Sequence, residues 1–543
     1  MNRRLLLVMS LIIVLIAIGV AAVHMVEASG TIYIKADGSV EGTDKIQRVG
    51  DIYTFTDNIY DEIVVQRSSI VIDGNGYIVQ GTGTINSRGI YLDGIGNVTI
   101  RNTNIKGFYY GVLLKSTSHN VLCLNSITEN HEGGIGLYNS SYNSIVGNSI
   151  TNNAYGIEVY PSSNNSIIGN NITNNGNGIY LRYSSNNSVV GNNITNNGNG
   201  IYISSSSNNS ISGNNIINNG EGLFLFSSSG SSIVGNNITA NRWQGIALWW
   251  SSSNNISDNS ITNNNDQGIS LTVYSNYNKI CRNNIINNTY GIHAKAGGWE
   301  LGRPMSSSNN TVYHNNFINN QIQALNEELS TNVWDNGYPS GGNYWSDYTG
   351  LDANGDGIGD TTYVIDANNT DRYPLMSPLI LPQYELVVSI TAPSSISLGS
   401  SSSLDAIVTN QGPSDAINVK LVLFINGTTV KSTTLPLLQV GNSYTLSYHW
   451  TSTVKGVYNV TAYAHPMLSE TSVENNKMTE FITVVAQPSG LAIDPIVLYA
   501  LVIVVIAIAT AVGFFMIRKK KKPSEKFVEY TCNIRSFIAM DNI

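Results

Sequence analysis

The most constraining feature of this chain is a repeat of 22 or 23 residues in its central part, marked by glycines that each precede an aliphatic residue. These glycines are Gly89, Gly111, Gly134, Gly156, Gly178, Gly200, Gly222, Gly245, Gly268 and Gly291. Each unit contains short alternating apolar segments separated by Asn, Gly and Ser, which is typical of strands and turns. Because no unit has the apolar face of a helix and a fixed period indicates a stacked array, the repeat predicts a parallel β-helix with three short strands per coil.

Several residue types recur at fixed positions of the repeat. Aliphatic columns, such as the one from Ile145 to Ile280, are expected inside the coils, since alternate strand residues share a face. Two asparagine columns accompany them: Asn125, Asn148, Asn170, Asn192, Asn214, Asn236, Asn259 and Asn283, and Asn130, Asn153, Asn175, Asn197, Asn219, Asn241, Asn264 and Asn288. Amides stacked about 4.8 Å apart can bond from coil to coil, so both columns are expected inside as ladders. Asn187, outside both columns, is expected to face outward.

This pattern resembles the right-handed parallel β-helix repeats of NosD-like and carbohydrate-binding or sugar-hydrolase families, and above all archaeal surface proteins. The resemblance covers residues 31 to 375, and Asp73-Gly74-Asn75-Gly76 resembles the opening coil of the family. It implies the fold rather than an activity, because this scaffold carries lyases, hydrolases, adhesins and non-catalytic binders alike.

The ends of the chain predict a membrane anchor. Arg3 and Arg4 precede an uncharged run to Val23, which is typical of a secretion signal, with an uncleaved N-terminal anchor as the alternative. Ile496 to Ile517 carries no charge and is followed by Arg518 to Lys522, as in a membrane-spanning helix with a cytoplasmic basic tail. We therefore expect a signal peptide (1–28), a cap with the first coils (29–84), the β-helix (85–325), a C-terminal cap and linker (326–382), a β-sandwich (383–487), a linker (488–495), a transmembrane helix (496–517) and a tail (518–543).

The sandwich is expected because the composition changes after the linker. Val, Leu and Thr alternate in about seven short runs, and Asn426-Gly427 is a hairpin signal. The phrases VTNQGPSDAINVKLVLFINGT and LPLLQVGNSYTLSYHW resemble the CARDB family, a cell-adhesion-related module of microbial surface proteins. That resemblance brings no catalytic residues.

One short motif predicts a cation site. Asp352, Asn354, Asp356 and Asp360 place side-chain oxygens at positions 1, 3, 5 and 9 of a loop, and Ile358 supplies a carbonyl at position 7. This pattern suits Ca²⁺, although Tyr363 stands where an EF-hand has Glu. The segment resembles the C-terminal cap of NosD-like proteins, which implies a structural ion; an acidic turn is the alternative.

Aromatic residues are expected on the outward face of the strand that follows each glycine. They are Tyr138, Tyr160, Tyr180, Tyr202, Phe224, Phe226 and Trp249. Rings have apolar faces and polar rims, and an exposed apolar patch usually has a partner, so these residues are candidates for stacking on sugar. The alternative is that the aromatics stack only on each other or are covered by a loop.

A catalytic set is less evident. A glycosidase or lyase needs paired carboxylates, or a carboxylate with a cation, and Glu158 with Arg182 on the next coil is the only such pair in these columns. A surface ion pair is the simpler interpretation. Copper would need clustered His, Met or Cys, whereas His119, His131, His293 and His314 are scattered.

Composition narrows the function further. Only 12% of residues are charged and the net charge is −8, which does not favour a nucleic-acid partner. We expect an all-β protein at the cell surface, a right-handed parallel β-helix followed by a β-sandwich and one C-terminal transmembrane helix. The favoured role is non-catalytic, in adhesion, surface display or binding of extracellular glycans or surface proteins. A polysaccharide lyase or glycoside hydrolase is the alternative, and a copper-related role is the weakest.

Overall fold

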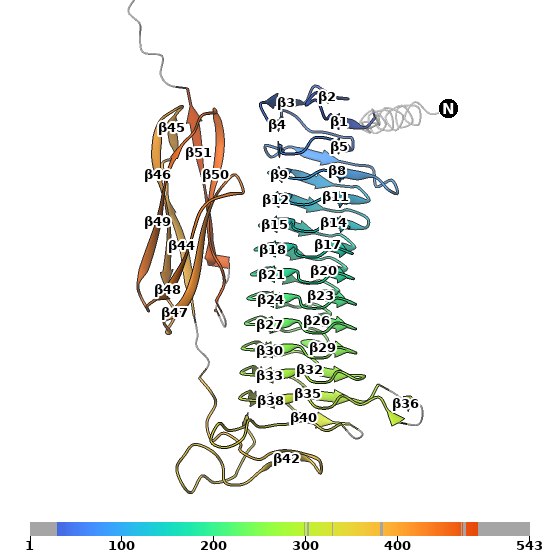
Figure 1. Ribbon diagram of the computed structural model, residues 1–543, viewed down its shortest axis with the longest axis vertical. Helices are drawn as coiled ribbons and strands as arrows, with labels where there is room; N and C mark the ends of the chain where they lie inside the picture. The colour runs from blue at the N-terminus through green and yellow to red at the C-terminus, as the bar shows by residue number, and fades with distance from the viewer. Residues whose placement is uncertain are drawn as a thin grey trace, which may run out of the picture.

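The computed structural model describes residues 30–486 except 298, 301–302, 328–329, 381–383, 468–469 and 471–473. Its larger part is a right-handed parallel β-helix in which three sheets of 14, 13 and 12 strands, called A, B and C, run the length of the solenoid (Figure 1). The smaller part is a β-sandwich. The predicted order, a β-helix followed by a β-sandwich, is confirmed.

Sheet A consists of β2 (Val40–Glu41), β1 (Ile32–Ile34), β5 (Ile63–Val65), β8 (Arg88–Asp93), β11 (Tyr110–Lys115), β14 (Gly133–Tyr138), β17 (Tyr155–Tyr160), β20 (Asn177–Arg182), β23 (Asn199–Ser204), β26 (Glu221–Phe226), β29 (Ile246–Trp249), β32 (Gln267–Thr272), β35 (Tyr290–Lys295) and β40 (Ile322–Asn326). Sheet B consists of β3 (Ile46–Val49), β4 (Ile52–Phe55), β6 (Val71–Asp73), β9 (Thr99–Arg101), β12 (Val121–Cys123), β15 (Ser144–Val146), β18 (Ser166–Ile168), β21 (Ser188–Val190), β24 (Ser210–Ser212), β27 (Ser232–Val234), β30 (Asn255–Ser257), β33 (Lys279–Cys281) and β38 (Thr311–Tyr313). Sheet C consists of β7 (Ile78–Gln80), β10 (Asn104–Lys106), β13 (Ser126–Thr128), β16 (Ser149–Thr151), β19 (Asn171–Thr173), β22 (Asn193–Thr195), β25 (Asn215–Ile217), β28 (Asn237–Thr239), β31 (Ser260–Thr262), β34 (Asn284–Ile286), β39 (Asn316–Ile318) and β41 (Tyr344–Trp345).

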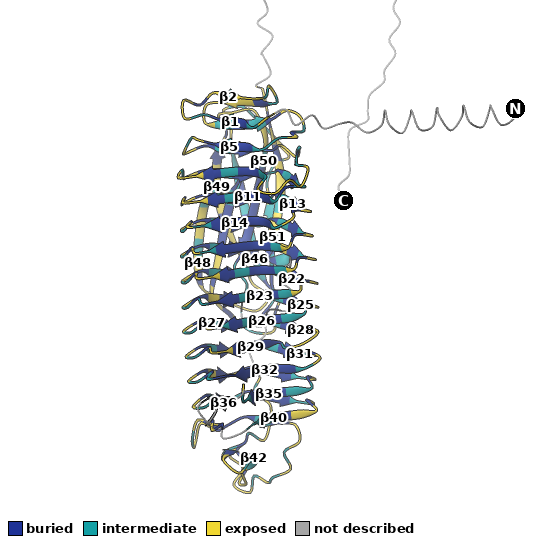
Figure 2. Cartoon of the chain, turned by 90° about the vertical axis from the view of Figure 1, so that its right-hand side faces the viewer, coloured by how far each residue is buried: buried dark blue, intermediate teal, exposed yellow. Residues whose placement is uncertain are grey.

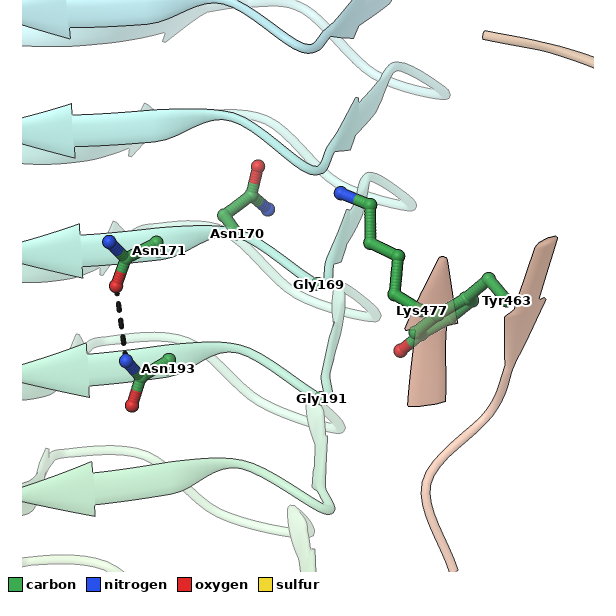
Figure 3. A pocket seen from close by; sticks show the side chains of 7 residues that line it. All are labelled: Gly169, Asn170, Asn171, Gly191, Asn193, Tyr463 and Lys477. Carbon is green, nitrogen blue, oxygen red and sulfur yellow. Dashed lines mark hydrogen bonds between the residues drawn. The ribbon is translucent and has the colours of Figure 1, made fainter. Parts of the chain in front are cut away.

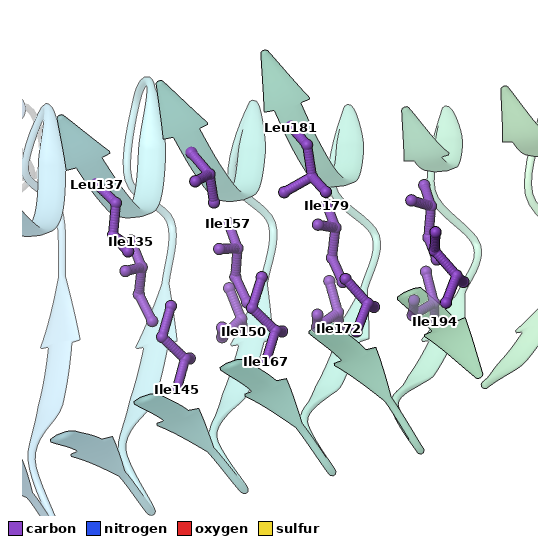
Figure 4. Packing of buried hydrophobic residues seen from close by; sticks show 14 of the residues in the cluster. Ile135, Leu137, Ile145, Ile150, Ile157, Ile167, Ile172, Ile179, Leu181 and Ile194 are labelled. Atoms are coloured by element: carbon purple, nitrogen blue, oxygen red, sulfur yellow. The ribbon is translucent and has the colours of Figure 1, made fainter. Parts of the chain in front are cut away.

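Corresponding strands of successive coils pair in parallel and in register, so each repeat position becomes a column. Ile145 pairs with Ile167 in sheet B, and Ile150 pairs with Ile172 in sheet C. All four side chains are fully buried, and the aliphatic columns interdigitate inside the coils (Figure 4). The core is therefore one continuous cylinder, with each coil buried by its neighbours.

The asparagine ladders lie at the corners of the coils. The Nδ2 of Asn170 donates to Oδ1 of Asn192 over 3.0 Å, and Asn175 Nδ2 donates to Asn197 Oδ1 over 3.1 Å, as the two predicted columns require. A third ladder was not expected. Asn187 belongs to it, is buried and donates to Asn209, so the prediction that Asn187 faces outward was wrong. This corner joins sheets A and B, and its turn had the sequence signature of an exposed loop.

The glycine column has a steric cause. A Cβ on Gly156 would lie 2.5 Å from the carbonyl oxygen of Gly178, and one on Gly178 would lie 2.5 Å from that of Gly200. Each glycine faces inward, and so does the aliphatic residue after it. Because successive residues of a straight strand face opposite sides, the chain must bend at the glycine, between sheets C and A. The residue before each glycine therefore faces outward.

Both ends of the solenoid are closed. At the N-terminal end β2 and β3 pair antiparallel with β1 and β4. At the C-terminal end the ring of Trp345 stacks between Phe317 at 4.3 Å and Tyr363 at 4.2 Å, and its indole N–H donates to buried Asp371. Two short hairpins lie at this end: β36 (Trp299–Glu300) with β37 (Arg303–Pro304), and β42 (Tyr363–Asp366) with β43 (Asn369–Asp371).

The sandwich packs two sheets around its own core. The first has β44 (Leu386–Thr391), β46 (Ser401–Asn410) and β49 (Ser443–Thr451), and the second has β45 (Ser395–Ser397), β51 (Lys477–Val485), β50 (Gly456–Ala464), β47 (Ala416–Ile425) and β48 (Thr428–Leu438). The 3-10 turn η1 (Glu474–Asn476) precedes β51. The sandwich lies beside the sheet B side of the solenoid, so the outward face of sheet A is on the opposite, open side (Figures 1 and 2).

The predicted signal peptide (1–28) and transmembrane helix (496–517) fall outside the described residues. Within the described part of the chain, no helix has the length and apolar character needed to cross a membrane.

Candidate functional site

The outward face of sheet A brings together the aromatic residues singled out in the sequence. Tyr180, Tyr202 and Phe224 pair in register across β20, β23 and β26. Tyr138 pairs with Tyr160 across β14 and β17, and Phe226 with Trp249 across β26 and β29. All seven lie in two adjacent columns of one face.

One column is a stack of rings. Tyr155 and Tyr180 stack at 5.5 Å, Tyr180 and Tyr202 at 4.9 Å, and Tyr202 and Phe224 at 5.0 Å between ring centroids. These distances match the spacing of about 4.8 Å between coils, so each ring lies flat against the next. The faces of Tyr180 and Tyr202 are covered and only their edges and hydroxyls reach outward. The outward surface of this column therefore consists of ring edges and hydroxyls, whereas the hypothesis of stacking on sugar assumed free ring faces.

The second column is an edge-to-face chain. Tyr110 contacts Tyr138 at 6.0 Å, Tyr138 contacts Tyr160 at 5.8 Å, and Tyr160 contacts Tyr183 at 5.8 Å between centroids. The Arg182 guanidinium lies 5.3 Å from the ring centroids of both Tyr160 and Tyr183. These cation–π contacts hold the Arg182 guanidinium against the rings of Tyr160 and Tyr183.

Glu158 lies in the column of Tyr180, next to the column of Tyr138 and Tyr160, and is held by phenols. The hydroxyls of Tyr110 and Tyr138 both donate to its Oε2 over 2.8 Å, and the carboxylate is buried. Burial, together with the charge of Glu158, raises the pKa of Tyr110 and Tyr138, so both phenols stay protonated donors. The ion pair expected between Glu158 and Arg182 was wrong: none joins them among the described residues, and Arg182 engages tyrosine rings instead.

Two glycines of β14 make room for this arrangement. A Cβ on Gly133 would lie 2.5 Å from the Tyr110 ring, and a Cβ on Gly136 would lie 3.1 Å from it. The ring of Tyr110 thus crosses the intervening strand to reach Glu158, two coils away. Tyr110 was missed in the sequence because simple alternation from Val112 places it inside, whereas the bend at Gly111 turns it outward. We call Tyr110, Tyr138, Glu158, Tyr160 and Tyr180 the tyrosine patch.

The far end of the same face carries a second polar group. His293 lies in the column of Tyr180 and Tyr202, is buried, and places Nε2 2.7 Å from Oε1 of Glu327. Burial lowers the pKa of His293, so its imidazole is neutral near pH 7. With Nε2–H donating to the carboxylate, Nδ1 keeps its lone pair, and it has no hydrogen-bond partner. A neutral imidazole oriented by a carboxylate is a competent proton acceptor.

A hollow of about 440 Å³ lies beside this face, at the turns that lead into β23 and β26. Its lining includes Asn199, Gly220, Arg242 and Trp243. The Trp243 side chain is 47% exposed, so its ring, unlike those of the stacked column, presents free surface to solvent.

The predicted cation loop folds around Asp352. Its Oδ1 accepts the backbone N–H of Gly355 over 2.7 Å, its Oδ2 accepts that of Gly357 over 2.9 Å, and Asp360 Oδ2 accepts that of Ala353 over 2.7 Å. The donor set consists of oxygens alone, which fits Ca²⁺. Across the described residues no group of three or more His, Cys, Asp or Glu side chains is arranged to hold a metal ion. The calcium site stays a prediction.

Three family models match the chain. Residues 50–194 and 88–238 match the right-handed beta helix region, residues 177–350 match the periplasmic copper-binding protein NosD, and residues 383–480 match CARDB. The resemblance inferred from the repeats and the sandwich phrases, a NosD-like β-helix with a C-terminal CARDB-like domain, is thus confirmed.

Curated relatives are similar over a short stretch. The probable ABC transporter binding protein NosD of Stutzerimonas stutzeri is 35% identical over 104 residues, which is 19% of this chain and 21% of the relative. Its counterpart in Pseudomonas aeruginosa is 33% identical over 19% of this chain and 22% of the relative. The matched part thus spans about a fifth of the length of these relatives.

Solved structures share parts of the fold. The CARDB domain of a Pyrococcus furiosus protein, crystallised with di-metal ions, is 27% identical over 20% of this chain and 95% of that one, with a TM-score of 0.19. The periplasmic alginate epimerase AlgG is 18% identical over 55% of this chain and 81% of that one, with a TM-score of 0.42.

Proposed function

We propose that this protein is a cell-surface-anchored, non-catalytic β-helix protein that binds extracellular glycans through the outward face of sheet A. The observation that carries the proposal is the tyrosine patch, in which two phenols hold a buried carboxylate among aromatic residues on the open side of the solenoid. A carboxylate held in this way accepts hydrogen bonds from sugar hydroxyls, and tyrosine edges supply both apolar contact and further hydroxyls.

The side of the molecule on which the patch lies also supports this role. The sandwich covers the opposite side, so within residues 30–486 no other domain lies over sheet A (Figure 2). Aromatic residues that are only partly covered cost solubility, and patches of this kind mark interaction sites. Adhesion to another surface protein through the same patch is the related alternative.

The proposal that the protein is anchored in the membrane rests on the sequence alone. We propose that residues 1–28 direct secretion and that residues 496–517 span the membrane, with the basic tail in the cytoplasm. The ectodomain would then stand outside the cell, where glycans are available.

We propose a structural Ca²⁺ in the loop of Asp352, Asn354, Asp356, Ile358 and Asp360. The ion would bind the carboxylates and the Ile358 carbonyl and hold the C-terminal cap, which covers the aromatic end of the core. Chelation should lower the melting temperature of the full-length protein, and Asp352→Asn with Asp356→Asn should abolish that response. An unchanged melting temperature on chelation of the unmodified protein would exclude the ion.

The binding proposal is tested on a glycan array with the purified full-length protein. Tyr180→Ala with Tyr202→Ala should weaken binding at least tenfold with a circular dichroism spectrum like that of the parent. Tyr277→Ala is the matched control, because Tyr277 is 65% exposed and lies on a turn away from sheet A. Equal losses in both variants, or no binding to any glycan, would reject the proposal.

The enzyme alternative rests on His293 and Glu327. A neutral imidazole next to a carboxylate could abstract a proton from a sugar ring, and the pair lies at one end of the same face. Assays for reducing ends and unsaturated products over a polysaccharide panel test it. Turnover that disappears in His293→Gln, while binding persists, would replace the binder with an enzyme. A copper-related role is the weakest candidate, since His119, His131, His293 and His314 lie on different strands and turns and belong to no metal-holding cluster of the described residues.

A further inference from the structure

The sandwich docks on a column of small residues at the turns between sheets B and C. Tyr463 of β50, Pro466 and Lys477 of β51 reach toward Gly147, Gly169, Gly191 and Gly213. Figure 3 shows Tyr463 and Lys477 on the side of the sandwich that faces Gly169 and Gly191. A separate contact joins Arg101 Nη1 to the carbonyl oxygen of Asn426 over 3.0 Å.

Contact with the sandwich, and not the local backbone conformation, explains why these positions are glycine. All four have φ between 59° and 64°, but the same column carries Leu124, Asp258, Arg282 and His314 elsewhere, at φ of 57° to 59°. Side chains are thus tolerated in this conformation. A Cβ on Gly191 would lie 2.5 Å from the Tyr463 hydroxyl, one on Gly213 would lie 2.8 Å from Pro466 Cβ, and one on Gly147 would collide with Lys477 Nζ. At Gly147, Gly191 and Gly213 the sandwich leaves no room for a side chain, and at Gly169 a Cβ would only contact the Tyr463 ring at 3.7 Å.

A cavity of about 310 Å³ remains inside this junction. It is lined by Gly169, Asn170, Asn171, Gly191, Asn193, Tyr463 and Lys477. On the solenoid side Asn193 Nδ2 donates to Asn171 Oδ1 over 3.1 Å (Figure 3). On the sandwich side the Tyr463 hydroxyl is buried and has no hydrogen-bond partner. An unpaired buried hydroxyl is unfavourable, and a ligand can supply the partner that this group lacks.

The same cavity holds a cation without a counter-charge. No carboxylate of the described residues lies within ion-pair distance of Lys477 Nζ. Its ionisable neighbour is the Cys123 thiol, whose pKa burial raises to about 12, so that group is neutral. Arg101, on the same side, is already paired with Asp73 over 2.9 Å. Burial lowers the pKa of Lys477, because the charged form is poorly solvated there.

We propose that the junction cavity binds a small oxyanion, a carboxylate, sulfate or phosphate group, through the Lys477 ammonium and the Tyr463 hydroxyl. A bound anion supplies both missing partners at once, and it also links the two domains, since its ligands come from the sandwich and its walls from the solenoid. The anion therefore favours the docked arrangement. This site is separate from the glycan face and does not depend on it.

The test uses the full-length protein with inorganic sulfate and phosphate as probes. Calorimetry should show one saturable site, and small-angle scattering should show a smaller maximum dimension with the anion than with chloride at equal ionic strength. Lys477→Met, which keeps the side-chain length, should weaken anion binding at least tenfold and remove the compaction. Tyr463→Phe should weaken it several-fold and leave the sandwich folded, since it deletes one oxygen.

Lys455→Met is the control, because it removes an exposed lysine of the sandwich that does not line the cavity. Sulfate also stabilises proteins non-specifically by exclusion, an effect that all variants share. The same anion response in Lys477→Met and in the parent, or the absence of a saturable site in the parent, would overturn the proposal. If Lys477→Met does not fold, unaltered anion affinity in Tyr463→Phe would overturn it instead.

Discussion

The two sides of the solenoid are built from one repeat and differ in what the repeat leaves outside. On the open side, sheet A carries large side chains in register, with Tyr180 and Tyr202 stacked and Glu158 held by phenols. On the covered side, the corresponding turns are reduced to Gly169 and Gly191, against which Tyr463 and Pro466 pack. The inward positions are nearly constant on both sides. The inward positions of each coil therefore determine the fold. The outward positions alone distinguish the aromatic face of sheet A from the glycine turns that pack against the sandwich.

The largest expected effect on stability comes from changes in the asparagine ladders, which both sides of the solenoid share. Asn192 Oδ1 accepts from both the backbone N–H and the Nδ2 of Asn170, so Asn192→Leu leaves the buried backbone N–H unpaired, while Nδ2 keeps two backbone carbonyl acceptors. One buried donor left unpaired costs about 1–3 kcal/mol, and the free energy of unfolding should fall by at least that amount. Asn187→Leu should cost about as much, because Asn187 is buried in the third ladder. Thermal unfolding measures both.

The control for the ladder variants is Asn186→Gly, an exposed position with a φ of 58° where glycine is unstrained. It should change the unfolding midpoint little. If Asn187→Leu proved as mild as this control, the third ladder would not be part of the core.

The glycine column inside the coils comes next. Gly178→Ala adds a Cβ 2.5 Å from the Gly200 carbonyl, so the coils must separate locally, at about 1–3 kcal/mol for an overpacked core. Gly50→Ala is a comparison outside this column, at a φ of 63° with nothing near the added Cβ, and there only backbone strain remains. Chemical denaturation should rank Gly178→Ala as the more destabilising of the two. The reverse order would mean that close approach of the coils does not explain the repeat.

Much of this could be anticipated from the sequence, for a physical reason. Because the coils are nearly identical, each inward position recurs as a column. The inward orientation of Ile145 and Asn170 could therefore be predicted from the repeat alone. A local bend changes the side that a residue faces, and the alternation of polar and apolar residues does not show this. The bend at Gly111 turned Tyr110 outward, and the corner of Asn187 had the composition of a loop. Glu158 was assigned to Arg182 because the two lie on neighbouring coils, but Gly133 and Gly136 let a tyrosine reach it from two coils away. The junction depends on residues more than 250 positions apart, which no local pattern shows.

The covered side should also respond to pH. Burial raises the pKa of Glu470, in the segment between Tyr463 and Lys477, to about 7. The native state thus binds a proton that the unfolded state has lost above its ordinary pKa of 4.5, so this group's contribution to stability falls as pH rises from 4.5 to 7. His465, whose pKa burial lowers to about 4, acts in the opposite sense, and its contribution is lost as pH falls from 6.5 toward 4. The two contributions oppose each other between pH 4.5 and 6.5, so Glu470→Gln should make the melting temperature rise with pH across that range more steeply than in the parent.

The smallest effect on stability should come from the open side. Tyr138→Phe removes one hydrogen bond to Glu158 while Tyr110 keeps the other, so the loss should be about 1 kcal/mol. Glycan affinity should fall more than stability, because Glu158 is then held by one hydroxyl instead of two. A variant with unchanged affinity would show that the carboxylate is structural.

The most direct test of the account is to locate bound glycan on the solenoid. Hydroxyl-radical footprinting of the full-length protein, with and without the tightest-binding polysaccharide from the array, reports the accessibility of individual tyrosines. Protection should appear at Tyr138, Tyr160, Tyr180 and Tyr202 and be absent at Tyr277. Protection at the sandwich or at the turns of sheets B and C, with the tyrosine patch unchanged, would contradict the assignment of sheet A as the binding face.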